Sequence, residues 1–334
     1  MTEKSGHLLN ELYPDALDLI LYPTEQCNFR CTYCYEDFDV GRMSVETVNA
    51  VKSFIQRKAR SVSRINIKWF GGEPLAAKDI IIDVAQHALA CTRDSNVHVQ
   101  GDLTTNGFLL SPAVVEELVD LNQNIFQVSL DGQREIHDKT RRLLSGGNTF
   151  DRIWANLRRM AEMPINFKTI LRLHLTKGNL QSIENLLKEI AEFANGDDRF
   201  FVFFKPVEQL SSRPIEDVEL LARSAWATIL ERMHEKAAEL GLGIVREDKV
   251  CYAARTNSIA IRANGKVQKC TVLLNDPVND VGSIRSDGTL EIEAGRLIPW
   301  VEVLLGDDDR AIACPASSIM RARAGRRVIP ILAN

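Results

Sequence analysis

Six short apolar segments, each followed by an amphipathic segment, are the feature that most restricts the folds open to this 334-residue chain. The apolar segments have the length of buried strands, and the segments after them have the apolar periodicity of helices. Strand followed by helix, repeated along a chain, indicates a parallel sheet covered by helices. The predicted strands are Leu17–Pro23, Ile65–Phe70, Val97–Leu103, Ile125–Leu130, Phe167–Leu175 and Phe200–Phe204. The predicted helices are Ser44–Arg60, Ile80–Arg93, Pro112–Leu121, Phe150–Met163, Leu180–Ala194 and Ile215–Leu240.

The pattern changes after Gly241. Two alternating segments flank Asn264-Gly265, and Asn-Gly in that setting is the strongest short signal of a β-hairpin. Thr289–Ile292 predicts one more short strand. The sequence therefore predicts an N-terminal extension (1–16), an α/β domain (17–240) and a small β-rich domain (241–334).

Composition and charge exclude several classes of protein. A formal net charge of −4 disfavours a general grip on nucleic acid, which needs a basic face. No segment approaches the ~18 apolar residues of a membrane span, and Met1–Asn10 lacks the apolar core of a signal peptide. Seven cysteines without a secretory signal fit a reducing compartment. We expect a cytoplasmic protein that binds neither nucleic acid nor membrane.

Three cysteines, Cys27, Cys31 and Cys34, follow the first predicted strand with the spacing C-x3-C-x2-C. A [4Fe–4S] cluster normally takes four thiolates, so a triad leaves one iron without a protein ligand. An open coordination position is where a metal site performs chemistry. A structural zinc site would need a fourth ligand nearby, and disulfides would leave one cysteine over. Both remain alternatives at this point.

The triad, followed by the aromatic Tyr35, resembles the radical S-adenosylmethionine (SAM) superfamily. The resemblance implies an open partial (β/α)6 TIM barrel, which matches the six predicted strand–helix units. It also implies that the open iron chelates the amino and carboxylate groups of SAM. In that family, reductive cleavage of SAM yields a 5′-deoxyadenosyl radical that abstracts hydrogen from the substrate. Fe–S clusters and SAM supply the radical chemistry, and the protein positions them.

Glycine and polar residues end the next three predicted strands. Gly71 and Gly72 allow a backbone to approach a ligand closely, and Glu73 can accept a hydrogen bond from an ammonium group. They resemble the family's GGE motif, which binds the SAM amino group, and Arg141 is expected to pair with the SAM carboxylate. The cofactor-binding residues that the resemblance implies are Tyr33, Gly71, Gly72, Glu73, Thr105, Asn106, Ser129, Asp131 and Arg141, with Arg172 and Thr176 as further candidates. Plain strand-ending turns are the alternative.

A second cysteine set follows in the C-terminal region. Cys251 and Cys270 enclose Gly265 in the pattern C-x13-G-x4-C, and Cys314 lies downstream. The first pair resembles the opening of the SPASM and twitch extensions, which hold auxiliary Fe–S clusters. The resemblance implies one auxiliary [4Fe–4S] cluster held by Cys251, Cys270 and Cys314, with a fourth site that is open or filled by substrate or a non-cysteine group.

The chain departs from the full SPASM pattern, which continues C-x2-C-x5-C-x3-C. If Cys314 is the first cysteine of that run, the second position is Ser317. If Cys314 is the second, the next two positions are Met320 and Ala324. A buried thiol without a cluster is the alternative for Cys314.

The resemblance implies a radical SAM oxidoreductase that matures ribosomally synthesised peptides (RiPP maturation), for example by a cross-link or ring closure. Only about 16 residues precede the first predicted strand, too few for a folded domain, so we expect a separate peptide-recognition protein or the barrel mouth to bind a peptide substrate. The other expected partners are a precursor peptide and a reductant such as flavodoxin or ferredoxin. A small-molecule substrate, as in molybdopterin-precursor cyclases, and a non-catalytic Fe–S protein are the alternatives. The sequence identifies no catalytic acid or base.

Overall fold

The computed structural model describes residues 15–209, 215, 217–306 and 308–325, so nearly all of the predicted 1–16 extension lies outside the described residues. The described strands form one eleven-stranded sheet, in the order β13-β12-β11-β10-β1-β3-β4-β5-β7-β8-β9, and a two-stranded sheet, β2-β6. The strands of the barrel are β1 (Ala16–Leu21), β3 (Arg64–Trp69), β4 (His98–Thr105), β5 (Gln123–Leu130), β7 (Lys168–Leu175), β8 (Phe200–Pro206) and β9 (Gly243–Ile244). The remaining strands are β2 (Phe29–Cys31), β6 (Arg141–Leu143), β10 (Ser258–Ile261), β11 (Lys266–Gln268), β12 (Asp280–Ile284) and β13 (Leu290–Ile292).

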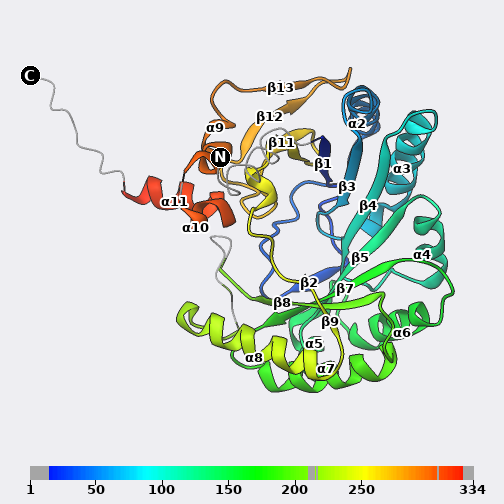
Figure 1. Cartoon of the computed structure of the whole chain (residues 1–334), viewed down its shortest axis with the longest axis vertical. Coiled ribbons are helices and arrows are strands. Elements are labelled where there is room, and N and C mark those ends of the chain that lie inside the picture. The colour runs from blue at the N-terminus through cyan, green and yellow to red at the C-terminus, as the bar shows by residue number, and fades with distance from the viewer. Residues whose placement is uncertain (1–14, 210–214, 216, 307, 326–334) are drawn as a thin grey trace, which may run out of the picture.

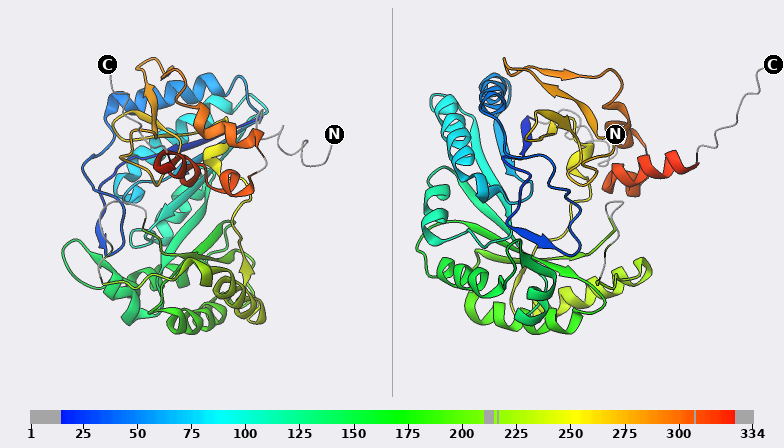
Figure 2. Two further views of the ribbon diagram at one scale, coloured as in Figure 1. Left: turned by 90° about the vertical axis from the view of Figure 1, so that its left-hand side faces the viewer. Right: turned by 180° about the vertical axis from the view of Figure 1, so that it is seen from behind.

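Strands β1, β3, β4, β5, β7 and β8 run parallel, with helices on the outer face of the sheet (Figures 1 and 2). In β3, Ile65, Ile67 and Trp69 are buried, while the alternate residues Asn66 and Lys68 are only partly buried. This period of two places one set of side chains against the helices and the other in the barrel interior. The predicted α/β partial barrel is confirmed, and all six predicted strands are present with small shifts at their ends.

The described α-helices are α2 (Val45–Lys58), α3 (Lys78–Thr92), α4 (Pro112–Val119), α5 (Arg134–Thr140), α6 (Phe150–Ala161), α7 (Leu180–Ala194), α8 (Trp226–Glu239), α9 (Ile298–Val301), α10 (Asp309–Ala313) and α11 (Pro315–Gly325). Five predicted helices are confirmed. The predicted start of the sixth at Ile215 is wrong, because the helix begins at Trp226 after a 3-10 turn (Arg223–Ala225). The preceding segment is instead tied to the end of β7 by a hydrogen bond from Lys177 N to Glu219 O (2.9 Å).

The C-terminal region continues the barrel sheet. The predicted hairpin is confirmed, since β10 and β11 pair antiparallel and Gly265 turns between them with a φ of +82°. Strand β10 also pairs parallel with β1, so the two regions share a sheet. They share one apolar core as well, which contains Leu19 of β1 and Trp300 of α9. The two cysteine-bearing regions are therefore held together by packing, while α10 and α11 lie at the periphery (Figures 1 and 2).

None of the helices in the described part of the chain is both long and apolar enough to cross a bilayer.

Candidate active site

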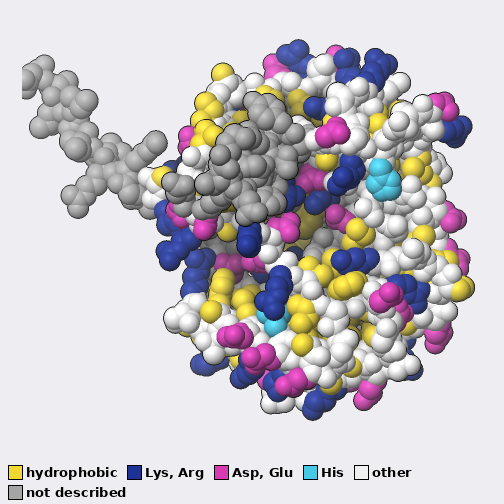
Figure 3. Space-filling model, in the orientation of Figure 1, with side chains coloured by type: hydrophobic (Ala, Val, Ile, Leu, Met, Phe, Trp, Pro, Cys, Tyr) yellow, Lys and Arg dark blue, Asp and Glu magenta, His cyan; other side chains and the backbone are white. Residues whose placement is uncertain are grey.

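One pocket gathers most of the residues predicted to bind cofactors. The carboxyl ends of parallel strands meet at one edge of a barrel, and loops at that edge form active sites in α/β barrels. Figure 3 shows the face of Figure 1 hollowed near its centre, with charged side chains around the hollow. The predicted residues that line the pocket are Cys27, Cys31, Tyr33, Cys34, Gly71, Gly72, Thr105, Asn106, Ser129 and Arg141, together with the further candidate Arg172.

The first cysteine triad lies on the segment that contains β2, which pairs with β6. Strand β2 pairs antiparallel with β6, placing Cys31 opposite Arg141. All seven cysteines are free thiols, so the disulfide alternative is wrong. Burial, with a smaller contribution from Cys31, raises the pKa values of Cys27 and Cys34 to about 12. A cysteine binds a metal as its thiolate. This loop therefore needs a compensating cationic group before its cysteines ionise.

An iron–sulfur cluster fits these donors better than one zinc ion. Within the described ranges, no three His, Cys, Asp or Glu side chains converge closely enough to hold a single metal ion. A zinc site packs its ligands about one atom at Zn–S distances of about 2.3 Å, whereas a cluster offers a separate iron to each thiolate. Three partly buried thiols beside an open pocket suit a cluster with one iron facing that pocket.

Two glycines let the turn after β3 lie directly on the cysteine loop. A Cβ at Gly72 would stand 2.6 Å from the carbonyl oxygens of Glu25 and Gln26. Gly71 has a φ of +112°, and its Cβ would lie 2.3 Å from the carbonyl oxygen of Thr24. Any side chain here would push the turn away from the loop that carries Cys27, so both positions require glycine.

Glu73 lies behind the pocket lining rather than in it. Its carboxylate accepts hydrogen bonds from Thr105 Oγ1 (2.8 Å), Asn106 N (2.8 Å) and Leu75 N (3.0 Å). Its side chain is fully buried. The carboxylate therefore joins the turn after β3 to the end of β4 and orients Thr105 and Asn106 beside Cys27. A contact between Glu73 and the SAM amino group remains a prediction.

A buried polar network centres on Asp131, which also lies behind the lining. The Tyr33 hydroxyl donates to Asp131 (2.7 Å to Oδ1), and Thr140 Oγ1 donates to its other oxygen (2.6 Å). His174 Nδ1 lies 3.2 Å from Asp131 Oδ1, and Arg141 Nη1 donates to the Tyr33 hydroxyl (2.9 Å). Burial would raise the pKa of Asp131, but the hydrogen bond from His174 and the charge of Arg141 lower it well below its usual value. Asp131 is therefore an anionic hub that positions Tyr33 and Arg141.

The sequence reasoning missed His174 and Glu36. His174 occupies the end of β7, a position equivalent to the strand ends that were considered. Glu36 lines the pocket, is 5% exposed, and has no hydrogen-bond partner for either carboxylate oxygen. Burial and the neighbouring charge of Glu25 raise its pKa to about 8. The sequence signal for Glu36 is an acidic residue two positions after Cys34.

The second cysteine set is brought together from three segments. Cys251 N donates to Ile312 O (3.1 Å), which joins the segment before Cys314 to that of Cys251. The Tyr252 hydroxyl accepts from Thr271 N (2.8 Å), next to Cys270. Burial, with smaller contributions from Cys270 and Cys314, raises the pKa of Cys251 to about 11. The three thiols that the sequence pattern grouped are therefore neighbours in space.

Tyr35 connects the two sets. It lines the pocket and packs against the small apolar cluster that contains Tyr22 and Leu274. Burial raises its pKa well above the usual value, and the charges of Cys34 and Cys270 both contribute. One aromatic side chain thus lies near a cysteine of each set.

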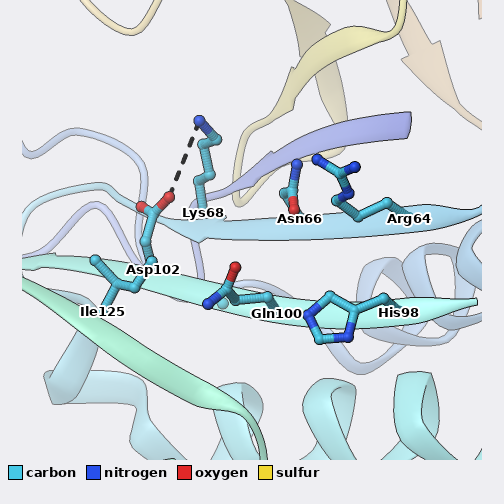
Figure 4. Close-up of a pocket in the computed structure, with 8 residues that line it drawn as sticks. Arg64, Asn66, Lys68, His98, Gln100, Asp102 and Ile125 are labelled. Carbon is cyan, nitrogen blue, oxygen red and sulfur yellow. Dashed lines mark ion pairs between the residues drawn. The ribbon is translucent and has the colours of Figure 1, made fainter. Parts of the chain in front are cut away.

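A second pocket lies at the opposite ends of the strands (Figure 4). It is bordered by Arg64 and His98, which begin β3 and β4, and by the ion pair between Lys68 and Asp102 (3.9 Å). None of the residues predicted to bind a cofactor lines this pocket. The side chains that line it carry charges of both signs. The candidate active site remains the cysteine-lined pocket.

Comparisons with known proteins place this site in a family. The radical SAM superfamily matches residues 21–190. An uncharacterized protein of Methanocaldococcus jannaschii, MJ0804, is 28% identical over 174 residues, 52% of each chain, so this chain spans about half of that relative. A GTP 3′,8-cyclase of Clostridium botulinum is 21% identical over 284 residues, covering 81% of this chain and 83% of the cyclase.

Solved structures share the fold. The enzyme anSMEcpe with bound AdoMet and Cp18Cys peptide has a TM-score of 0.66 and 17% identity, over 89% of this chain and 85% of that one. Streptococcus suis SuiB bound to its precursor peptide SuiA has a TM-score of 0.59 and 17% identity, over 91% of this chain and 69% of SuiB. The family match includes the cysteine triad, the glycine turn and the ends of β4, β5 and β7 that line the pocket, and this chain belongs to the radical SAM superfamily of enzymes.

Proposed function

We propose that this radical SAM enzyme binds a [4Fe–4S] cluster at Cys27, Cys31 and Cys34 and modifies a peptide at the barrel mouth. The observation that carries the proposal is the convergence of this triad, the glycine turn and the polar strand ends on one pocket. When bound, the reduced cluster supplies the reductive cleavage of SAM. The protein's own contribution is to hold SAM, orient the substrate and exclude water.

Particular groups in the pocket suit SAM. Gly71 and Gly72 allow backbone carbonyl groups to approach its ammonium group. The Nε of Arg141 is buried and lacks a partner, so the guanidinium retains a donor for the SAM carboxylate. Asp131 and His174 hold Tyr33 and Arg141 in place. Ser129, Thr105 and Asn106 supply hydroxyl and amide groups for the ribose and methionine.

A peptide is the substrate class that fits best. Two structures with this fold, anSMEcpe and SuiB, contain bound peptides. The pocket also extends beyond the cysteines to Lys205 and Glu208 at the end of β8, and it includes the unpartnered carboxylate of Glu36. Since a buried carboxylate is costly without a donor, a substrate N–H or ammonium group suits this wall. The precursor peptide, a peptide-recognition protein, and flavodoxin or ferredoxin remain the proposed partners.

The proposal includes one auxiliary cluster at Cys251, Cys270 and Cys314. The hydrogen bonds that join their three segments support it. A buried ammonium group supports it as well, since Lys269 is fully buried beside Cys270 and binds the carbonyl oxygens of Arg255 and Ser258. A cation in this position offsets the negative charge of clustered thiolates.

A small-molecule substrate is the second candidate. The similarity to GTP 3′,8-cyclase spans 81% of this chain. That enzyme's name describes a nucleotide substrate. The auxiliary site would then bind the substrate beside the same pocket.

Co-expression separates the two candidates. The chain is produced anaerobically together with short peptides encoded beside its gene, and the mass of each peptide is measured by mass spectrometry. A mass change that requires Cys31 supports the peptide proposal. Unchanged peptides, together with a GTP-dependent product from the purified enzyme, would overturn it.

A further inference from the structure

The side-chain oxygen of Ser317 lies beside a cysteine of the auxiliary set. Cys314 Sγ and Ser317 Oγ are 3.1 Å apart, and this is the contact that the structure gives to the Ser317 side chain. Cys314 immediately precedes α11 and Ser317 lies in its first turn. Residues three apart at this point of a helix present their side chains to the same side.

This spacing is that of a ligand pair. Cys314-Pro315-Ala316-Ser317 reads as C-x2-S, and C-x2-C is the spacing by which many iron–sulfur proteins hold a cluster. Pro315 suits the first position of the helix, because its missing N–H has no helical acceptor there. The helix start therefore fixes the Cys314 and Ser317 side chains side by side.

Tyr252 and Asn279, which lie near these cysteines, already have hydrogen-bond partners. The Tyr252 hydroxyl is bound to Thr271 N (2.8 Å) and Thr271 Oγ1 (2.7 Å). The Asn279 amide binds the backbone on both sides of Cys270, through Cys270 N (2.8 Å) and Leu273 O (3.0 Å). The protonated ammonium group of Lys269 has no free electron pair, so it cannot be a metal ligand.

We propose that Ser317 is the fourth protein ligand of the auxiliary [4Fe–4S] cluster, completing the set formed by Cys251, Cys270 and Cys314. This inference rests on the proposed auxiliary cluster. When Ser317 Oγ binds iron, its hydroxyl proton passes to solvent, as do the thiol protons of the three cysteines. The auxiliary cluster is then fully ligated by the protein, and the substrate does not bind to its iron.

The test isolates the auxiliary site in the full-length chain. A Cys27→Ala/Cys31→Ala/Cys34→Ala background removes the SAM-site ligands. Ser317→Ala, Ser317→Cys and the matched control Ser318→Ala are added to it, and each protein is reconstituted anaerobically with iron and sulfide. Iron is counted, transfer of iron to a chelator is timed, and the three-iron EPR signal is recorded after brief ferricyanide oxidation.

The inference predicts about four irons per chain in the background protein. Iron should leave this protein slowly, and equally slowly after the added Ser318→Ala or Ser317→Cys change. Ser317→Ala should release one iron about tenfold faster and give the three-iron signal. Loss of all iron in Ser317→Ala alone would support the same conclusion. Equal iron release from the background and Ser317→Ala proteins would overturn the inference, and so would a background protein that binds no iron. SAM cleavage by the wild-type protein is measured separately. The test of the auxiliary site therefore does not depend on the cluster at the first triad.

Discussion

The Glu25 carboxylate and the Arg262 guanidinium form an ion pair, although 237 positions separate them in the chain. Glu25 is 0% exposed and Arg262 is 3% exposed. Glu25 stands two residues before Cys27, while Arg262 immediately follows β10 and also donates to Leu274 O (2.9 Å). The pair therefore joins the loop that carries the first cysteine set to the region that carries the second.

Breaking this pair should be costly, because the remaining charge is left buried. Glu25→Gln or Arg262→Met should each lower the free energy of unfolding by about 3–5 kcal/mol. Replacing both residues should cost less than the sum of the single changes. Urea unfolding of the apo protein measures this, with Arg285→Met as the control. Arg285 pairs with Glu291 at the surface, where solvent screens the charges and loss of the ion pair should change stability little. Equal effects at the two sites would contradict a structural role for the buried pair.

Gly72 should not tolerate a side chain. Gly72→Ala places a Cβ against two backbone carbonyl groups of the cysteine loop, so we expect a loss of about 1–3 kcal/mol in stability. Iron retention by the first triad should fall with it. Gly41→Ala is the matched control, because a Cβ at Gly41 meets no atom within 4 Å. Thermal unfolding and iron content of the two variants give the comparison, and a Gly72→Ala protein that behaves like Gly41→Ala would refute the close approach.

The two cysteine sets should separate by function. Cys270→Ala should reduce iron from about eight to about four per chain, retain SAM cleavage and stop formation of the modified product. Cys91→Ala is the control, since Cys91 lies on α3 and contacts His87 instead of either set (3.2 Å). Iron content per chain and the mass of the product are measured for both variants. Normal turnover by Cys270→Ala would exclude a working auxiliary cluster.

Stability should fall with acid through His174. Burial lowers the pKa of His174 to about 4, and the Asp131 carboxylate reverses only part of that effect. The unfolded chain therefore binds more protons than the folded chain between pH 6.5 and 4, and stability falls as pH falls through this window. His174→Asn should reduce the slope of unfolding free energy against pH by about 1 kcal/mol per pH unit. Urea titrations from pH 6.5 to 5 measure the slope, and an unchanged slope in the variant would show that His174 is not buried in its neutral form.

The sequence predicted the barrel and the triad because each depends on local pattern. The strands of the barrel carry apolar segments, and Cys27, Cys31 and Cys34 lie within eight residues. The start of α8 was not predictable, because a tertiary hydrogen bond from Lys177 holds the preceding segment out of the helix.

The network around Asp131 and the unpartnered Glu36 were also beyond sequence reasoning. His174 and Tyr33 are 141 positions apart, so their meeting depends on the order of strands in the sheet. The joining of β10 to β1 depends on the sheet in the same way. Residue type identified the groups that carry chemistry, but burial and missing partners appear only when the chain is folded.

Formation of 5′-deoxyadenosine tests the central claim most directly. The anaerobically reconstituted protein is mixed with SAM and dithionite, and the nucleoside is quantified by chromatography for the wild type, Cys31→Ala and Cys91→Ala. We predict that the wild type and Cys91→Ala produce 5′-deoxyadenosine and that Cys31→Ala produces none. An inactive, fully iron-loaded wild type, or a Cys31→Ala protein as active as the wild type, would contradict an iron at this triad that binds SAM.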